Sequence, residues 1–389
     1  MKNESLRETL KKNAMLVVLI LVFLFFLIVT KGSIFSPSSF SELINQNAYV
    51  YILGAGMLMC MLTGGNIDLS CGAFVCLLGA FGGLFMIVQG LGAGISIVLL
   101  ILIGVAYGVL LGYLIAYVHI PPWIATLAGF LAFRGLGTSI LTSNSTTGSL
   151  APFPKDFRDI FYGRVFPTDK GVFNWPCFIA GVIAAALVVL IVFRTRSTRL
   201  KKGYEADTVG RAALKSCIGG AAIILVMTRL AMDGGIPTTL LWVVGIILIY
   251  SFITSKTTIG RHFYVVGGNM EAARLSGVNT RRIMFLAYLN MAVLTAIATF
   301  TVVARSQSAY ADVGKNFEMD AISACVVGGV SASGGAGTVL GMVIGATLIG
   351  VINLGMSLIS LDANYQRVVK GFVLLAAVVF DILSKQKQK

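Results

Sequence analysis

The side chains that most often perform chemistry are scarce in this chain. Its 389 residues include two histidines, His119 and His262, and six cysteines that are scattered without a C-x-x-C pair. This pattern predicts neither a metal site nor a disulfide framework, and it makes a Ser-His-Asp set improbable. No G-x-x-x-x-G-K-[ST] loop occurs, so we expect no catalytic residue and no nucleotide, cofactor or metal bound by this chain.

Two glycine-rich breaks interrupt long apolar runs near opposite ends of the chain. The first reads LTGGNIDLSCGAF at 62–74, and the second reads CVVGGVSASGGAG at 325–337. In a membrane, backbone leaves helical pairing only where protein or a water-lined cavity satisfies its polar groups, so such breaks are typical of a translocation path. A short inner loop between two spans explains the same residues equally well. The candidate path residues are Gly65, Asn66, Asp68 and Ser70 in the first break, and Gly328, Gly329, Ser331, Gly334 and Gly335 in the second.

A few charged residues lie within or beside the apolar runs. Asp68 precedes a predicted helix start, so we expect it to cap that helix with help from Ser70 rather than to contact substrate. Arg134 lies deep in its run, and we expect it to face the interior and bond backbone carbonyls, a structural role favoured over a pore-lining one. Arg229 lies four residues from Asp233, and pairing or snorkelling explains it.

One polar stretch, GRHFYVVGGNMEAARLSGVNT at 260–280, has the features of a short helix in a soluble protein. Asn269 suits an N-cap, Glu271 lies in the positive first turn, and Arg274 is placed to pair with it at i, i+3. Gly277 suits the left-handed position that ends a helix. These signals predict about two turns of helix, which need tertiary support because so short a helix is marginal alone.

Small side chains at Ala272 and Ala273, beside Leu275, allow another surface to approach this helix closely. That surface belongs either to a partner or to the rest of the same chain. Local physics favours neither interpretation over the other.

Composition requires that these features sit in a membrane. The chain is 57% hydrophobic and 12% charged, with a mean hydropathy of +0.89. Unbroken apolar runs predict an all-α polytopic protein of about ten to twelve transmembrane helices, forming a single domain over 1–389. The predicted spans are 14–30, 47–62, 69–89, 92–118, 122–142, 175–193, 216–232, 236–254, 283–304, 320–333, 336–360 and 364–383. The 320–333 segment is short enough to be re-entrant instead.

The distribution of basic residues orients these spans. Although the net charge is +14, the cations lie mostly in loops, so we expect no nucleic-acid partner. Four segments on one side hold 19 Lys and Arg, against 7 in three segments on the other. The excess predicts that both termini, the basic loop 194–215 and the segment 255–282 are cytoplasmic. The loop 143–174 is then extracytoplasmic, where it is either a docking surface or an ordinary solvated loop. The loop 194–215 either holds the orientation of its neighbours, which is favoured, or binds a lipid headgroup.

Several stretches together resemble the permease subunits of bacterial sugar importers of the ATP-binding cassette superfamily, in the ribose, galactose and xylose branch. They occur in order from about residue 47 to 381, and the chain's length makes it most similar to the xylose or multiple-monosaccharide type. The stretches are TGGNIDLSCG, PPWIATLAGFLAFRGL, TTIGRHFYVVGGNMEAARLSGVNTRR, AISACVVGGVSASGGAGTVLGMVIGATLIGVINLGM and YQRVVKGFVLLAAVVFD.

The resemblance implies a type II-like permease fold and a place in the bacterial inner membrane. It also implies a homodimer, a separate cytoplasmic ATPase that uses ATP and Mg, and an extracytoplasmic sugar-binding protein. The short cytoplasmic helix corresponds to the family's coupling helix, seated in a groove of the ATPase, and the two breaks to segments that line or shape the path. The coupling residues carried over in this way are Asn269, Glu271, Ala272, Ala273, Arg274, Ser276 and Gly277.

Asn66, Cys71 and the Ser331–Ser333 stretch depart from the family pattern, which leaves the identity of the sugar open. The competing hypothesis is an ion-coupled secondary sugar transporter. That mechanism needs titratable or ion-binding groups within the membrane, and the acids available are Asp68, Glu318 and Asp320, all near span ends.

Overall fold

A computed structural model of the chain describes residues 14–169, 171–206 and 208–386, and these residues are mostly helical, as the sequence predicts. The long helices are α2 (Ala14–Val29), α3 (Pro37–Leu62), α4 (Cys71–Gly83), which continues into the π-helical turn η2 (Leu84–Val88), α5 (Ala93–Ala116), α6 (Pro122–Asn144), α8 (Trp175–Lys201), α9 (Val209–Met232), α10 (Thr238–Lys256), α13 (Thr280–Ser306), α15 (Val339–Leu358) and α16 (Ala363–Gln386). The short elements are η1 (Ser33–Phe35), α7 (Lys155–Tyr162), α11 (Thr258–Gly268), α12 (Met270–Leu275), α14 (Phe317–Val327) and the two-residue strands β1 (Ser149–Leu150), β2 (Arg164–Val165), β3 (Ile236–Pro237) and β4 (Ala309–Tyr310).

Eight helices in the described residues are long and apolar enough to cross a membrane. The predicted span at 320–333 is different, because the helix there, α14, has 11 residues. At 1.5 Å per residue it is about 16 Å long, roughly half the ~30 Å of a hydrocarbon core. The expectation of a full span at this position was wrong, and the short helix agrees with the re-entrant alternative.

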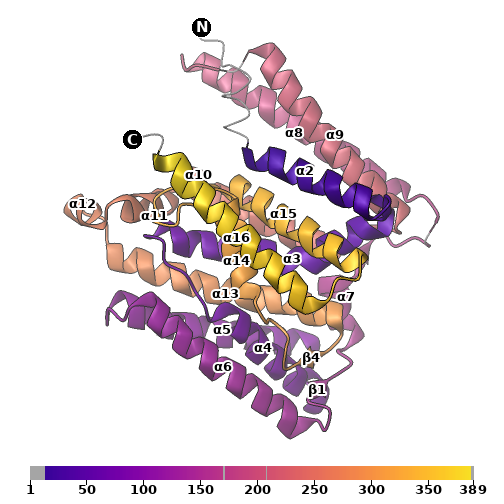
Figure 1. Cartoon of the computed structure of the whole chain (residues 1–389), viewed down its shortest axis with the longest axis vertical. Coiled ribbons are helices and arrows are strands. Elements are labelled where there is room, and N and C mark those ends of the chain that lie inside the picture. Colours follow the sequence, from indigo (N-terminus) through magenta and orange to yellow (C-terminus); the bar gives the residue numbers. More distant parts are fainter. Residues whose placement is uncertain (1–13, 170, 207, 387–389) are drawn as a thin grey trace.

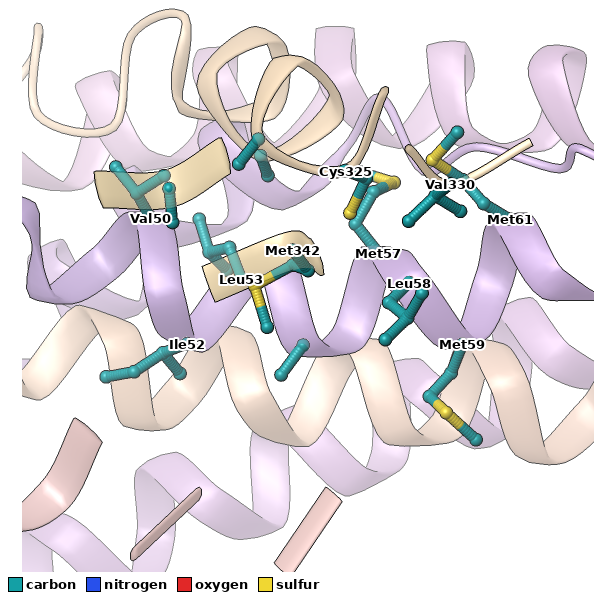
Figure 2. Close-up of a cluster of buried hydrophobic side chains, with 14 of the residues drawn as sticks. Val50, Ile52, Leu53, Met57, Leu58, Met59, Met61, Cys325, Val330 and Met342 are labelled. Atoms are coloured by element: carbon teal, nitrogen blue, oxygen red, sulfur yellow. The ribbon is translucent and has the colours of Figure 1, made fainter. Parts of the chain in front are cut away.

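The helices form an inner group surrounded by outer ones (Figure 1). In α15 and in α4 with η2, 72% of the apolar segment is buried, whereas in α8 and α9 the buried share is 17%. α3 runs through the centre and packs on α13, α14 and α15. Figure 2 shows its side chains, among them Leu53 and Met57, against Cys325, Val330 and Met342. The core therefore joins the first quarter of the chain to its last fifth.

The loop 143–174 is structured in its described part. Strand β1 pairs antiparallel with β4, and β2 pairs antiparallel with β3, so the loop is fastened at two points. Between them, α7 buries Phe157 and Phe161 against Phe300. Because of these contacts, the described part of the loop packs against the helices and does not extend freely into solvent.

Near this loop, the expected pairing of Arg229 with Asp233 does not occur. Asp233 instead forms a 2.7 Å ion pair with Arg164, which lies in strand β2 of the loop. The Arg229 guanidinium lies 4.0 Å from the ring centroid of Phe35, a cation–π contact. Sequence spacing alone missed Arg164 because the partner comes from a distant segment.

The strand pair β1–β4 and the helix α12 lie at opposite ends of the helices in Figure 1. Strands β1 and β4 are on the right, and α12 projects on the left. α2 begins on the left, and α16 ends there. The start of α2 and the end of α16 therefore lie on the same side of the picture as α12.

Candidate functional site

The helix predicted at 270–276 is present as α12, Met270–Leu275. Oδ1 of Asn269 accepts a hydrogen bond of 3.0 Å from the backbone amide of Ala272, so Asn269 is the N-cap. The preceding helix, α11, ends at Gly268, immediately before this cap. One residue therefore ends one helix and begins the next, and the chain turns sharply there.

The end of α12 also follows the prediction. Gly277 has a φ of +81°, the left-handed conformation that glycine adopts without strain. The amide of Val278 donates to the carbonyl of Ala273, and the amide of Gly277 donates to that of Arg274, both at 3.0 Å. Together these bonds form a Schellman motif, which satisfies the last carbonyls of the helix. The expected pair of Arg274 with Glu271 is present at 3.3 Å on the surface.

The two alanines of α12 point in different directions. Ala273 is fully buried within the main core, so it serves packing on the same chain and not a partner. Ala272, Ser276 and Leu275 are exposed, Leu275 by 84%. The helix is thus fixed by one face and open on the other. Of the two interpretations left open for these alanines, packing on the same chain applies to Ala273.

The structure brings the two glycine-rich breaks into direct contact. A Cβ atom on Gly65 would overlap the carbonyl oxygen of Ala332, and one on Gly334 would overlap the Cα of Gly64. The amide of Gly335 donates to the carbonyl of Leu62 at 3.2 Å. Backbone therefore packs on backbone, with no side chain between the two breaks.

A third pair of glycines, from the end of α11, joins this contact. A Cβ atom on Gly267 would overlap the carbonyl oxygen of Leu62, and one on Gly335 would lie 2.8 Å from the amide nitrogen of Gly268. The hydroxyl of Tyr264 donates to the carbonyl of Gly337 at 3.0 Å. We call this cluster the glycine junction; its members are Gly64, Gly65, Gly267, Gly268, Gly334 and Gly335.

The glycine junction is directly connected to α12, because its member Gly268 is followed in the chain by the N-cap Asn269. Sequence reasoning identified two of its three parts but not their meeting. The third part, Gly267 and Gly268, did have a signal in the sequence. Two adjacent glycines before the cap destabilise a helix, so a close contact is the reason to expect them there.

Asp68 is buried and holds the turn before α4 rather than the helix itself. Its Oδ1 accepts from the amide of Ser70 at 2.8 Å and from the Ser70 hydroxyl at 2.5 Å. The N-cap position is Ser70, whose side chain makes no capping bond. The expected cap is thus displaced by two residues, into an Asx-type turn.

The polar contacts continue from this turn into α5. The Ser70 hydroxyl lies 2.7 Å from the hydroxyl of Tyr107, a partner that the sequence did not suggest. A Cβ atom on Gly129, in α6, would lie 2.7 Å from the Tyr107 hydroxyl oxygen. On the other side of Asp68, Asn66 Nδ2 donates to the Thr63 carbonyl at 3.1 Å. The first break is therefore held in place by its own polar groups.

The second break is a tight turn around Ser331, which is buried. Its amide donates to the carbonyl of Ala336 at 2.8 Å, and its carbonyl accepts from the amide of Gly334 at 3.1 Å. Gly328 serves a different purpose, because a Cβ atom there would overlap the carbonyl of Gly341 in α15. Gly329 has a φ of +84° and open space around it.

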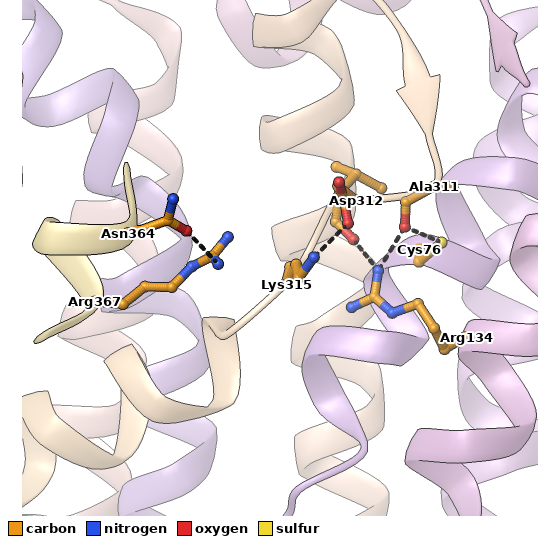
Figure 3. Close-up of polar contacts among 8 residues, drawn as sticks. Cys76, Arg134, Ala311, Asp312, Lys315, Asn364 and Arg367 are labelled. Atoms are coloured by element: carbon orange, nitrogen blue, oxygen red, sulfur yellow. Dashed lines mark hydrogen bonds and ion pairs between the residues drawn. The ribbon is translucent and has the colours of Figure 1, made fainter. Parts of the chain in front are cut away.

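Arg134 makes the bonds that its position predicts. Its Nη1 donates to the carbonyl oxygens of Ala311 at 2.7 Å and Val313 at 2.8 Å. Figure 3 shows the guanidinium directed at this loop, with Asp312 and Cys76 nearby. Both carbonyls follow β4, so one cation ties α6 to the segment that leads into α14.

Two of the three acids considered for ion coupling are held by partners. Asp320 accepts from Lys370 Nζ at 2.9 Å and from the Tyr49 hydroxyl at 2.6 Å. Asp68 is held by Ser70, as described. Glu318 is buried against Gly72, and its Oε2 has no hydrogen-bond partner within the described residues.

A protein-family model described as "Branched-chain amino acid transport system / permease component" matches residues 39–378. The chain belongs to this permease family. The permease is 32% identical over 377 residues to the xylose transport system permease protein of Haemophilus influenzae, with 96% of each chain covered.

Two further relatives extend the comparison. The permease is 33% identical to the xylose transport system permease protein of Escherichia coli strain K12, covering 96% of this chain and 92% of the relative. It is 27% identical to the ribose import permease protein of the same strain, covering 89% and 86%. No solved structure matches the permease. Family membership and the apolar helices identify a multi-pass membrane protein that serves transport rather than catalysis.

Proposed function

We propose that the chain is the transmembrane subunit of an ATP-driven monosaccharide importer of the bacterial inner membrane, with a pentose or hexose such as xylose as substrate. The observation that carries the proposal is the position of α12, a capped helix with one exposed face that directly follows the glycine junction in the chain. Relatives named for xylose and ribose, which the chain matches over most of its length, support the choice of substrate class.

In this proposal α12 is the contact with a separate cytoplasmic ATPase, which binds ATP and Mg. The chain has no P-loop sequence and so relies on a partner for hydrolysis. The docking face consists of the exposed side chains of α12, with Leu275 as its apolar centre and Glu271 and Arg274 at its edge. An 84% exposed leucine on a polar helix gains free energy when a partner covers it.

The glycine junction provides the route from α12 to the path. When the ATPase moves α12, Gly267 and Gly268 press directly on both breaks, because no flexible side chain separates the backbones. Packed elements that are not continuously deformable turn a small shift into a change of arrangement. Residues 64–70 and 328–337 therefore change position together, which is what a gate lined by both breaks requires.

The remaining partners follow from the same function. A second copy of the chain completes the path, and an extracytoplasmic sugar-binding protein delivers the sugar to the side that carries the structured loop 143–174. Both termini are cytoplasmic. A neutral sugar requires hydrogen-bonding groups and water instead of fixed charge, which suits a site whose buried acids at 68 and 320 are already bound by partners.

The ion-coupled alternative is not favoured. It requires a titratable group free to bind and release an ion, and among the three acids considered only Glu318 has an oxygen without a partner in the described residues. The relatives that this chain matches are named as a xylose transport system permease and a ribose import permease, and these names give the ion-coupled alternative no support.

Reconstitution tests the proposal against that alternative. The chain is placed in proteoliposomes with its partner ATPase and binding protein, and labelled xylose uptake is measured with ATP, and separately with a proton or sodium gradient. Uptake that needs ATP and the ATPase is the expected result. Uptake by the chain alone on an ion gradient would overturn the proposal, and ATP-driven uptake of branched-chain amino acids without xylose or ribose uptake would overturn the substrate class.

A further inference from the structure

A basic cavity lies at the end of α8 opposite to its junction with the 143–174 loop. The cavity has a volume of about 690 Å³. Four of its lining residues are cations, Arg194, Arg199 and Lys202 from the end of α8 and its following turn, and Lys256 from the end of α10. Within the described residues, none of these four cations forms an ion pair. The structure therefore gathers unpaired positive charge around one hollow.

The other lining residues suit a phosphate that carries an apolar tail. Thr195, Thr198 and Tyr204, which carry hydroxyl groups, also line the cavity, and Ile191 adds an apolar side chain to the lining. Hydroxyls and guanidinium groups are the usual donors to phosphate oxygens. A cavity of this size is within the range that holds a small ligand or a lipid headgroup.

The position of the cavity favours a lipid as the source of that phosphate. α8 has 27 residues and is about 40 Å long, some 10 Å more than a hydrocarbon core. Its cations begin where its apolar run ends, and only 17% of the apolar segment of α8 is buried within the described residues, which leaves that segment available to contact lipid. Positive-inside bias explains how many cations lie here, but it does not explain their convergence from two helices on one cavity.

We propose that this cavity binds the phosphodiester headgroup of an anionic phospholipid in the cytoplasmic leaflet. The lipid bridges the α8–α9 pair, which is joined to the rest of the protein by few buried contacts, to the end of α10. α10 ends at Lys256 and α11 begins at Thr258, so the bound headgroup also steadies the segment that leads to α12. The binding itself does not depend on the proposed transport function.

The test is a lipid titration of the purified, delipidated chain, followed by native mass spectrometry with phosphatidylglycerol or phosphatidylcholine as the probe. The double variant Arg194→Gln/Arg199→Gln removes two lining cations. The matched control, Lys201→Gln/Arg211→Gln, removes two cations of the same loop that do not line the cavity. Both double variants remove two positive charges. Any effect of the lost charge on membrane insertion or on nonspecific lipid binding is therefore the same in the two variants.

We expect the first phosphatidylglycerol to bind more tightly than phosphatidylcholine, and the lining variant to weaken that binding about tenfold or more, with the control near wild type. If both double variants weaken phosphatidylglycerol binding equally, the effect comes from the total charge of the loop, and the proposed binding site is rejected. Displacement of the lipid by millimolar inorganic phosphate would overturn the lipid assignment in favour of a soluble phosphate compound, and no preference for phosphatidylglycerol would overturn both.

Discussion

The backbone amide of Gly335 donates a hydrogen bond of 3.2 Å to the carbonyl oxygen of Leu62. The bond joins the break that follows α3 to the break that precedes α15, and Gly267 packs on the same carbonyl. A single carbonyl thus lies where both breaks and the end of α11 meet. In the proposed function, motion of α12 reaches the two breaks through this point.

Gly334→Ala tests the close contact in the glycine junction. Its matched control is Gly329→Ala, because Gly329 has almost the same φ, +84° against +85°, but open space where Gly334 meets Gly64. Both variants carry the left-handed backbone cost of about 1 kcal/mol. The clash adds about 1–3 kcal/mol in Gly334→Ala only. Thermal unfolding in detergent measures the difference, and equal melting temperatures would contradict the packing described.

Leu275→Ser tests the docking face of α12. We expect the ATPase to co-purify at least about tenfold less well, because an exposed apolar anchor is lost, while the melting temperature stays unchanged. Leu200→Ser, at another exposed leucine in the basic loop, is the control and should leave co-purification intact. If Leu275→Ser assembles and transports like wild type, α12 does not dock through this face.

Asn269→Ala tests whether the ends of α12 must be capped. The variant loses the bond to the Ala272 amide and destabilises the helix by about 1 kcal/mol. We expect slower ATP-driven uptake with normal membrane insertion. Asn269→Ser retains a capping oxygen and should restore uptake, since serine caps about as well as asparagine. Equal loss in both variants would point to a direct contact of the amide instead of a cap.

Ala273→Arg separates packing from docking. Because Ala273 is buried in the main core, a long cation there should displace α12 from its own protein and lower the melting temperature, by the overpacking and charge burial it imposes. Ala272→Arg, on the exposed face, should leave the melting temperature unchanged and reduce only ATPase association. The same melting temperature for both variants would contradict the orientation of the two alanines.

Arg134→Met tests the structural role of the intramembrane cation. The change leaves the carbonyls of Ala311 and Val313 without their donor, and hydrogen bonds to charged groups are worth about 1.5–3 kcal/mol each. We expect a lower melting temperature, with uptake falling in proportion to folded protein. Lost uptake at an unchanged melting temperature would instead assign Arg134 to the path.

The sequence alone determined the features that depend on composition or on neighbours a few residues apart. Hydropathy predicted the membrane class and most of the spans. The caps of α12 at Asn269 and Gly277 followed from bonds that reach three to five residues along the chain, and residue type is enough to identify such bonds. The bonding of Arg134 to backbone carbonyls was also predictable, because a cation inside an apolar run must find hydrogen-bond acceptors.

Only the tertiary structure decided which distant segments meet. Spacing suggested Asp233 for Arg229, but β2 delivers Arg164 to Asp233. A two-turn helix has no sequence signal for which of its alanines is covered, so the inward face at Ala273 required the core. The glycine junction and the basic cavity likewise arise from packing between helices far apart in the chain. Local hydrogen bonding encodes where a helix ends, whereas close contact between backbones depends on how the helices are stacked.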